Sequence, residues 1–456
     1  MELHVKPGRS LHGSLSVPGD KSIAHRWLTL AATARGQSRL LGLPRSLDVR
    51  STAACLAGLS PKARSVLDLW SRLGPPTLQG GGSTWNASGN DAPGDELEVE
   101  GEGYMGLLEP PGDLDCGNSG TAMRLLAGVV SAAHFRTVLT GDVSLSARPM
   151  ERVAEPLRSM GARIATVEGH APLTIVGDDL HGIEHRPSVP SAQVKSAVLL
   201  AGAQASGSTT VVESVGTRDH TERALTALGA PVRLSEGAVS VSAFQHQGFS
   251  GQIPGDPSSA AFLVAAAALS GSQVTLVGVG LNPTRLHFVD VMRRMGVRIL
   301  THVDTDELGE PVGTIHVDPC DGIVPTRLAA DEIPRVIDEI PVLASLAAFA
   351  PAETWFLGVG ELRVKESDRL SAVVSGLRAL GGEAAAEGED LVIVGGGLDG
   401  GRVASGDDHR MAMSLTVAAL GATGPSTIEG IEAADVSFPG FTAALRKLGA
   451  DVEASR

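Results

Sequence analysis

Basic side chains at the beginning of an expected helix could bind a negatively charged ligand. In residues 17–26, VPGDKSIAHR, a Pro-Gly turn is followed by Lys21, Ser22 and Arg26 and by apolar residues at helical spacing. The free backbone N–H groups and the dipole of a helix N-terminus attract anions, and these three side chains would strengthen that attraction. The pattern indicates an anion site, although a capped surface helix with two solvated bases would look the same.

A second PGD turn indicates that this scaffold is duplicated. Residues 253–260 read IPGDPSSA, so the turn recurs 236 residues after the first copy and again precedes an apolar helix. The basic residues are missing from the second copy. A repeated turn with charges in only one copy is what a single site on a duplicated fold would leave.

Other segments of the first half could add groups to such a site. Residues 115–126, DCGNSGTAMRLL, form a Gly-rich turn before a helix, where Asn118 and Gly120 could hold a phosphate or a carboxylate. Arg148 precedes Pro149, which favours an extended backbone and therefore a loop. Further candidates begin an expected helix or follow an expected strand: Ser191, Gln193, Thr217 and Arg218.

The second half supplies more cations. Lys365, Glu366 and Arg369 precede or open an expected helix in RVKESDRLSAVVSGL, and His409 with Arg410 opens another. Bases are unfavourable at a helix N-terminus unless an anion is nearby, although a salt-bridge network could also account for the first cluster.

Asp338 lies directly before a very apolar helix, in IDEIPVLASLAAF. It could be a helix cap or a partly desolvated base. The cations that begin elements come from both halves of the chain: Lys21, Arg148, Arg369 and Arg410. Together they imply a cleft that closes around a ligand with several negative charges.

The elements that position these residues follow an internal repeat. A Leu-Gly or Met-Gly pair ends an apolar helical segment six times, beginning at residues 73, 160, 228, 295, 380 and 448. The first and fourth, second and fifth, and third and sixth pairs are 222, 220 and 220 residues apart. We therefore expect an α/β fold of two similar halves with three units each. The polar segment 79–106 fits no unit and is expected to form a hairpin or a long loop.

Composition limits the partners and the location. The chain has 456 residues, enough for two domains, and a net charge of −15, which argues against nucleic acid or an anionic membrane as a partner. Its three cysteines form neither a disulfide framework nor a metal pattern, and its longest apolar run is too short to span a bilayer. The N-terminus lacks the apolar region of a secretion signal. We expect a soluble cytoplasmic protein without a metal site.

The motifs resemble those of the 3-phosphoshikimate 1-carboxyvinyltransferase (EPSP synthase) family. PGDKSxxHR, GNSGTAMR, SLSARPM, SAQVKSA, RDHTE, RVKESDRL and DHRMAM occur in that family's order over nearly the whole chain. The resemblance implies two similar α/β domains, each of three βαβαββ units, in the inside-out α/β barrel arrangement of enolpyruvyl transferases. The expected lobes are residues 20–252 and residues 1–19 plus 253–456, with the active site between them.

The same resemblance implies a reaction. The family transfers the enolpyruvyl group of phosphoenolpyruvate to the 5-hydroxyl of shikimate 3-phosphate and releases phosphate, a step of aromatic amino acid biosynthesis that uses no cofactor. We expect these two substrates as partners, with no nucleic acid or membrane, and a monomeric enzyme. Glyphosate, an anionic mimic, is expected to compete with phosphoenolpyruvate.

Site roles are carried over to the residues that match the motifs. Asp338, Glu366 and Lys21 would be catalytic, and which carboxylate handles which proton is left open. Shikimate 3-phosphate would be bound by Lys21, Ser22, Arg26, Ser191, Gln193, Thr217, Arg218, Asp338 and Lys365. Phosphoenolpyruvate would be bound by Lys21, Asn118, Gly120, Arg148, Gln193, Arg369, His409 and Arg410.

The chain departs from the family pattern at two positions. Many members have Ser where this chain has Ala192, and some have Lys where it has Val436, so one phosphate donor and one cation would be missing. One alternative is UDP-N-acetylglucosamine enolpyruvyl transferase, which shares the fold and the donor but carries a Cys where this chain has Val143. The other is a non-catalytic anion-binding protein on the same fold.

Overall fold

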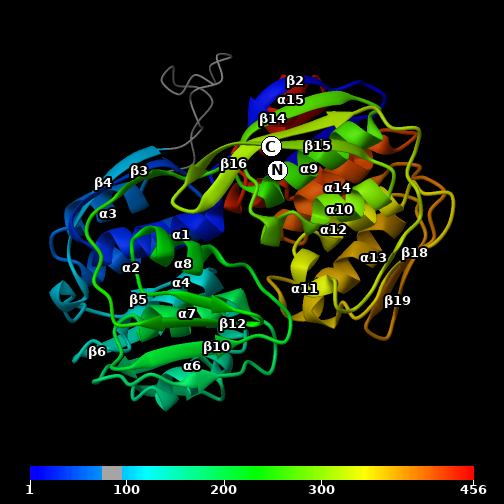
Figure 1. The fold of residues 1–456 in the computed structure, drawn as a ribbon. Helices are drawn as coiled ribbons and strands as arrows, with labels where there is room; N and C mark the ends of the chain where they lie inside the picture. The colour runs from blue at the N-terminus through cyan, green and yellow to red at the C-terminus, as the bar shows by residue number, and fades with distance from the viewer. Residues whose placement is uncertain (74–94, 456) are drawn as a thin grey trace.

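The computed structural model describes residues 1–73 and 95–455 and consists of two lobes of mixed strands and helices (Figure 1). The apolar core of the first lobe is built from residues between 23 and 253, and that of the second lobe from residues 3–17 and 260–452. Both chain termini lie in the second lobe (Figure 1). The lobe boundaries at residues 20 and 252 stay a prediction, which the two separate cores support.

The first lobe has three sheets, with the strand orders β13-β3-β4, β5-β6-β8-β7 and β11-β12-β10-β9. Its strands are β3 (Arg35–Leu43), β4 (Asp95–Glu102), β5 (Leu114–Asp115), β6 (Arg136–Thr140), β7 (Arg163–Val167), β8 (His170–Val176), β9 (Glu184–His185), β10 (Ser208–Val212), β11 (Arg233–Ser235), β12 (Ala238–Ser242) and β13 (Ser250–Gln252). Its helices are α1 (Lys21–Thr33), α2 (Leu47–Leu59), α3 (Arg64–Ser71), α4 (Gly120–Val130), α5 (Val143–Ser146), α6 (Glu151–Ser159), α7 (Ala192–Gly202), α8 (His220–Ala227) and the 3₁₀ turn η1 (Tyr104–Gly106).

The second lobe also has three sheets, with the strand orders β15-β16-β14-β2, β17-β18-β20-β19 and β21-β22-β1-β23. Its strands are β1 (Glu2–Lys6), β2 (His12–Ser16), β14 (Gln273–Gly280), β15 (Arg298–Glu307), β16 (Glu310–Asp318), β17 (Arg327–Leu328), β18 (Thr354–Phe356), β19 (Ala384–Glu387), β20 (Asp390–Ile393), β21 (Arg402–Ala404), β22 (Ser426–Glu429) and β23 (Asp451–Ser455). Its helices are α9 (Pro257–Leu269), α10 (His287–Arg294), α11 (Ile333–Val336), α12 (Ile340–Ala347), α13 (Arg369–Ala379), α14 (His409–Gly421), α15 (Phe441–Leu448) and the 3₁₀ turns η2 (Pro283–Arg285), η3 (Gly360–Val364) and η4 (Ile431–Val436).

Three helices in each lobe pack against one another and are buried along most of their length: α1, α4 and α7 in the first lobe, and α9, α12 and α14 in the second. Their sequences explain this position, because a helix such as α9, PSSAAFLVAAAAL, has no polar face to present to water. We call these six the central helices. The three sheets in each lobe match the three predicted units, and the predicted α/β fold with two similar lobes is confirmed.

The chain crosses between the lobes at the two PGD turns. Strand β1 pairs with β22 and β23, and β2 pairs with β14, so the first strands belong to the second lobe. Gly19 and Gly255 form a β-bridge where the two turns meet. A Cβ at Gly19 would lie only 2.2 Å from the carbonyl oxygen of Gly42, which is why the turn needs glycine there.

The polar segment 79–106 is only partly described. Its residues 95–102 form β4, which pairs antiparallel with β3, so the expectation of a hairpin or long loop is wrong for this part. The alternation of apolar Leu97 and Val99 with acidic residues is a strand pattern that the surrounding Gly and Asn residues obscured. Residues 79–94 lie outside the described residues.

Candidate active site

The six central helices begin at one cavity between the lobes. The cavity has a volume of about 230 Å³, and its wall includes residues from the first turn of each central helix or from the residues just before it: Lys21, Gly120, Ser191, Ser258, Asp338 and Arg410. Helix N-termini attract negative charge through their free N–H groups. Six of them at one cavity make it strongly favourable for anions.

Side-chain caps explain why these helices begin where they do. Asp20, Ser119, Ser191, Asp256 and Asp408 each accept a hydrogen bond from a backbone N–H in the first turn of the helix that they precede. A cap satisfies only one or two of the four N–H groups that an N-terminus leaves free. The first turns of the helices therefore retain their attraction for a ligand.

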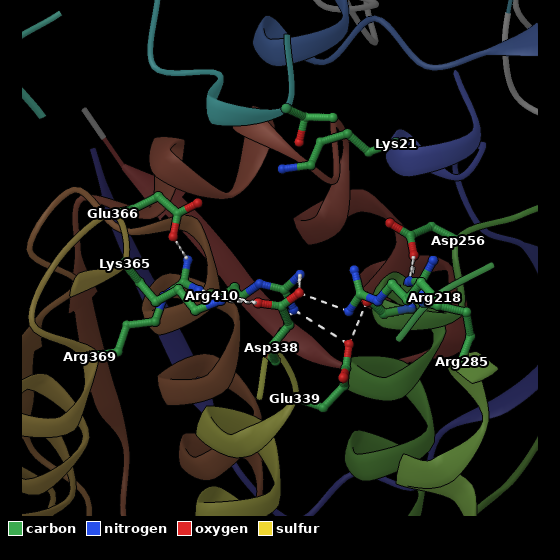
Figure 2. Close-up of polar contacts among 12 residues, drawn as sticks. Lys21, Arg218, Asp256, Arg285, Asp338, Glu339, Lys365, Glu366, Arg369 and Arg410 are labelled. Carbon is green, nitrogen blue, oxygen red and sulfur yellow. Dashed lines mark hydrogen bonds and ion pairs between the residues drawn. The ribbon is translucent and has the colours of Figure 1, made fainter. Parts of the chain in front are cut away.

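Asp338 is the anionic centre of the cavity. Its carboxylate lies 2.8 Å from Nη2 of Arg218 and 3.4 Å from Nζ of Lys365 (Figure 2). Arg410 and Arg369 approach it to 3.8 and 3.9 Å. Burial by itself would raise the pKa of Asp338, but these cations, Lys365 foremost, hold it well below its usual range. Because Arg218 comes from the first lobe, Asp338 joins the two lobes.

Glu366 is the second carboxylate at the cavity wall. It lies 2.7 Å from Nη2 of Arg369, and Nη1 of Arg148, from the first lobe, is 3.7 Å away. Burial would raise the pKa of Glu366, but Arg369 and the other nearby cations hold it well below its usual range. Both carboxylates are therefore ionised at neutral pH in this state.

The depressed pKa of Glu366 leads to a prediction about stability. Because the folded-state pKa lies below the ordinary value of 4.5, ionised Glu366 stabilises the fold above pH 4.5, and this contribution is lost as the pH falls from 4.5 toward the folded-state pKa. We expect the difference in unfolding free energy between the wild type and Glu366→Gln, measured by urea titration, to be constant from about pH 7 to 5 and to decrease at lower pH. A difference that is independent of pH down to the acid transition would contradict this.

Lys21 and His409 lie at the same wall. Nζ of Lys21 is 2.8 Å from Oδ2 of Asp48, on α2. Burial, together with Lys21 and Arg369, lowers the pKa of His409 to about 3, so its ring is neutral at physiological pH. The buried Nε2 of that ring has no hydrogen-bond partner among the described residues. His409 can thus exchange a hydrogen bond with a ligand without adding charge.

Polar groups of α1, α4, α7 and the segment before α8 also line the cavity. Oε1 of Gln193 accepts a hydrogen bond from Nη1 of Arg124 at 2.5 Å, and its Nε2 donates to the hydroxyl of Thr121 at 2.8 Å. The hydroxyl of Thr217 donates to Glu213 at 2.5 Å. The wall also includes the hydroxyl-bearing residues Ser22 and Ser191.

Three of the expected contacts lie behind the wall: Arg26, Asn118 and Arg369. The buried guanidinium of Arg26 donates to interior oxygens, including the carbonyl of Ser22. Asn118 accepts a hydrogen bond from Arg148. Arg369 is 1% exposed, behind the two carboxylates. In this arrangement the three hold wall residues in place, and direct contact with a substrate stays a prediction.

The structure adds Arg124, which was not among the predicted site residues. Arg124 lies at the wall on α4, beside Gly120 and one helical turn after it. That spacing places both residues on one helix face and was the signal available in the sequence. The pKa of Arg124 is lowered to about 10, mainly by burial and to a smaller extent by the nearby charges of Arg148 and Arg152. Mutual repulsion of these cations is relieved when an anion binds between them.

Two absences hold for residues 1–73 and 95–455. No group of three His, Cys, Asp or Glu side chains in these segments is placed to hold a metal ion. No helix in these segments has the length and apolar character that crossing a membrane requires.

Comparison with known proteins identifies relatives over nearly the whole chain. A family model described as EPSP synthase (3-phosphoshikimate 1-carboxyvinyltransferase) matches residues 5–69 and 90–445. The 3-phosphoshikimate 1-carboxyvinyltransferase of Acidithiobacillus ferrooxidans is 44% identical over 450 residues, covering 98% of this chain and 97% of the relative. That of Halorhodospira halophila is 45% identical over 455 residues, covering 98% and 96%.

Solved structures show the same likeness. EPSP synthase from Acinetobacter baumannii has a TM-score of 0.83 and 37% identity, with all of both chains covered. The enolpyruvyl transferase NikO from Streptomyces tendae has a TM-score of 0.74 at 20% identity, covering 100% of this chain and 98% of that one, and shows likeness of fold alone.

Proposed function

Because the chain belongs to the EPSP synthase family, it transfers the enolpyruvyl group of phosphoenolpyruvate to shikimate 3-phosphate, and we propose that it does so in the cavity between its lobes. The observation that carries this proposal is the convergence of cations and carboxylates from both lobes on one space (Figure 2). The reaction joins two substrates that each bear a phosphate and a carboxylate. They repel one another until cations neutralise them.

Shikimate 3-phosphate is assigned to the side of the cavity formed by α1, α7 and the segment before α8. Arg218 and the hydroxyls of Ser191 and Thr217 take the phosphate, Gln193 lies against the ring, and Lys365 adds a second cation from the other lobe. Ser22 lies on the carboxylate side with Arg26 behind it. Where many relatives would offer a further hydroxyl, this chain has Ala192, so Arg218 carries more of the phosphate charge.

Phosphoenolpyruvate is assigned to the side formed by α4, the loop before α6 and α14. Arg148, Arg410 and the backbone N–H of Gly120 bind its charges, with Arg369 and Asn118 holding these groups from behind. Arg124 adds a cation here. Where some relatives have a Lys, this chain has Val436, which carries no charge and is not among the residues of the cavity wall.

Acid–base chemistry is assigned to Asp338, Glu366 and Lys21. The 5-hydroxyl must lose a proton and the methylene carbon of phosphoenolpyruvate must gain one. In the unliganded state both carboxylates are weak bases because cations surround them. A bound phosphate takes Arg218 and Lys365 away from Asp338, so its pKa rises and it becomes a better base once the substrate is in place. Which carboxylate transfers which proton is left open, since the two share cations.

Phosphate release with two acceptors tests this function. We expect release from phosphoenolpyruvate only when shikimate 3-phosphate is present, measured with a coupled phosphate assay. Release only with UDP-N-acetylglucosamine would favour the sugar-nucleotide transferase, against which Val143 at the reactive Cys position already argues. No release with either acceptor would favour a non-catalytic binding protein.

The space around Gly120 leads to a prediction about phosphoenolpyruvate. A Cβ there would lie 2.8 Å from Nη1 of Arg124 and 3.5 Å from Nη1 of Arg148. Because Arg124 is flexible at its end, we expect Gly120→Ala to fold but to raise the KM for phosphoenolpyruvate about tenfold or more by displacing these cations. Competitive inhibition by glyphosate, expected for the wild type, should weaken in parallel.

A matched control separates the site from the substitution. Gly112→Ala meets nothing within 4 Å and has no positive φ, so its kinetics should equal those of the wild type. An unchanged KM in Gly120→Ala, or glyphosate inhibition that does not compete with phosphoenolpyruvate, would contradict the assignment.

We also propose that one chain acts alone in the cytoplasm, without nucleic acid or membrane. The proposed site is built from a single chain, and a net charge of −15 disfavours anionic partners other than substrates held by local cations. Light scattering of the purified protein would test the oligomeric state.

A further inference from the structure

The two PGD turns face one another at the junction of the lobes. The backbone N–H of Asp20 donates to the carbonyl of Pro254 at 2.7 Å, and the N–H of Asp256 donates to the carbonyl of Pro18 at 2.8 Å. Each Asp also caps the helix that follows it, α1 or α9. The duplicated halves of the chain therefore meet through equivalent groups, and the two capping carboxylates lie close together.

One guanidinium joins these two caps. Nη1 of Arg285, at the end of η2, lies 2.5 Å from Oδ2 of Asp20, and its Nη2 lies 3.0 Å from Oδ1 of Asp256. Arg285 is 4% exposed, and both carboxylates are also buried. Burial and the charge of Asp20 both raise the pKa of Asp256, whereas Arg285 lowers it. Without the guanidinium, two buried carboxylates would face one another unpaired.

The contacts continue from Arg285 to the proposed acid–base site. Its Nη2 donates to Oγ of Ser258 at 2.8 Å, and that hydroxyl donates to Oε1 of Glu339 at 2.5 Å. Glu339 is the neighbour of Asp338 in the chain and is 3% exposed. On the other side of the junction, Asp20 directly precedes Lys21. Arg285 thus lies between the helix that carries Lys21 and the turn that carries Asp338.

A histidine of the first lobe adds a fourth contact. Nη1 of Arg285 lies 3.2 Å from Nε2 of His220, at the start of α8, and Nδ1 of the same ring lies 2.7 Å from Oε1 of Glu310. A guanidinium can only donate, so Nε2 accepts and Nδ1 carries the hydrogen that is donated to Glu310. His220 lies two residues after Arg218, which the proposed site assigns to the substrate phosphate.

We propose that Arg285 is a positioning residue that sets the orientation of the lobes and so brings Lys21 and Arg218 of the first lobe into register with Asp338 of the second. Arg285 is also part of the cavity wall, but its guanidinium is bonded to Asp20, Asp256, Ser258 and His220, and we assign its effect to these contacts. The inference rests on the interlobe cavity being the active site. Figure 2 shows Arg285 and Asp256 beside Arg218, next to the cluster around Asp338.

Charge removal and charge restoration test this role. In Arg285→Met the unpaired carboxylates repel, and we expect kcat/KM for phosphoenolpyruvate to fall about 100-fold, with a raised KM for both substrates and a larger radius of gyration by small-angle X-ray scattering. Adding Asp256→Asn removes one of the two negative charges and should raise kcat/KM about tenfold above that of Arg285→Met.

Arg223→Met is the matched control. Arg223 also reaches from one lobe to the other, where it donates to the carbonyl of Gly309, but it does not contact the caps Asp20 and Asp256. Its kinetics should stay within about threefold of the wild type.

The outcomes separate the possibilities. If Arg285 had a merely structural role, Arg285→Met would lower kcat through a smaller active fraction and leave both KM values unchanged, and this result would overturn the proposal. A double variant that is no more active than Arg285→Met would overturn it as well. If Arg285→Met does not fold, Asp256→Asn alone, which keeps the Asp20–Arg285 pair, should still raise both KM values, and wild-type kinetics would overturn the proposal. A larger radius of gyration with unchanged phosphate release would instead show that the cavity is not the active site.

Discussion

Asp338→Asn is expected to lower kcat by about 10³-fold while the protein remains folded, because a general base contributes roughly 10²–10⁴-fold to such a reaction. The amide has nearly the shape of the carboxylate but can neither accept the proton nor respond to the loss of its cations. Four cationic side chains lie within 4 Å of this one group. Phosphate released per active site is the measurement.

The substrate constants make this prediction more specific. In the wild type the carboxylate of Asp338 competes with the substrate phosphate for Arg218 and Lys365. Removing its charge should leave the KM for shikimate 3-phosphate unchanged or lower, so the loss falls on kcat. Asp321→Asn, at a 91% exposed carboxylate that pairs with Arg298, is the control and should leave both constants unchanged. A decrease in kcat of less than about tenfold would remove Asp338 from the proposed chemistry.

Arg369→Met is expected to have the largest effect on stability. The guanidinium of Arg369 is 1% exposed and pairs with Asp408 at 2.8 Å and Glu366 at 2.7 Å, with Asp338 at 3.9 Å. Removing one partner from a buried ion pair leaves the other charge uncompensated and costs about 3–5 kcal/mol. We expect a decrease of this size in the unfolding free energy from urea titration, together with loss of measurable phosphate release.

Arg402→Met provides the matched comparison. Arg402 also pairs with two carboxylates, Glu2 and Glu429, but on the surface, where water screens the charges. We expect its unfolding curve to overlay that of the wild type. If the two variants lost similar stability, burial would not be what makes the Arg369 network important. If Arg369→Met were fully active, the buried ion pairs of Arg369 would not be needed for the reaction.

Much of the site could be predicted because its signals are local. A cap such as Asp20 or Ser191 bonds to an N–H within three residues, and helical periodicity is visible within a dozen. The repeat of Leu-Gly and Met-Gly pairs likewise needs no knowledge of contacts, and it predicted three units in each half. Segment 95–102 was missed because Gly and Asn around it outweighed a short strand pattern in β4.

The partners of the charges could not be predicted in this way. Arg218 and Asp338 are 120 residues apart in the chain, and Asp20 and Arg285 are 265 apart. No local pattern distinguishes Arg285, in a short 3₁₀ turn, from a surface arginine. For the same reason the wall position of Arg124, and the places of Arg26 and Asn118 behind the wall, follow only from packing.

By itself, therefore, the sequence determined the elements, their caps, the duplication and the set of charged residues at helix beginnings, because each depends on interactions within a few residues or on comparing one half with the other. Only the tertiary structure decided which of those charges share a cavity, which stand behind it and which carboxylates lose their ordinary pKa. The physical reason is that charges act through space at a few ångströms, and burial sets their strength.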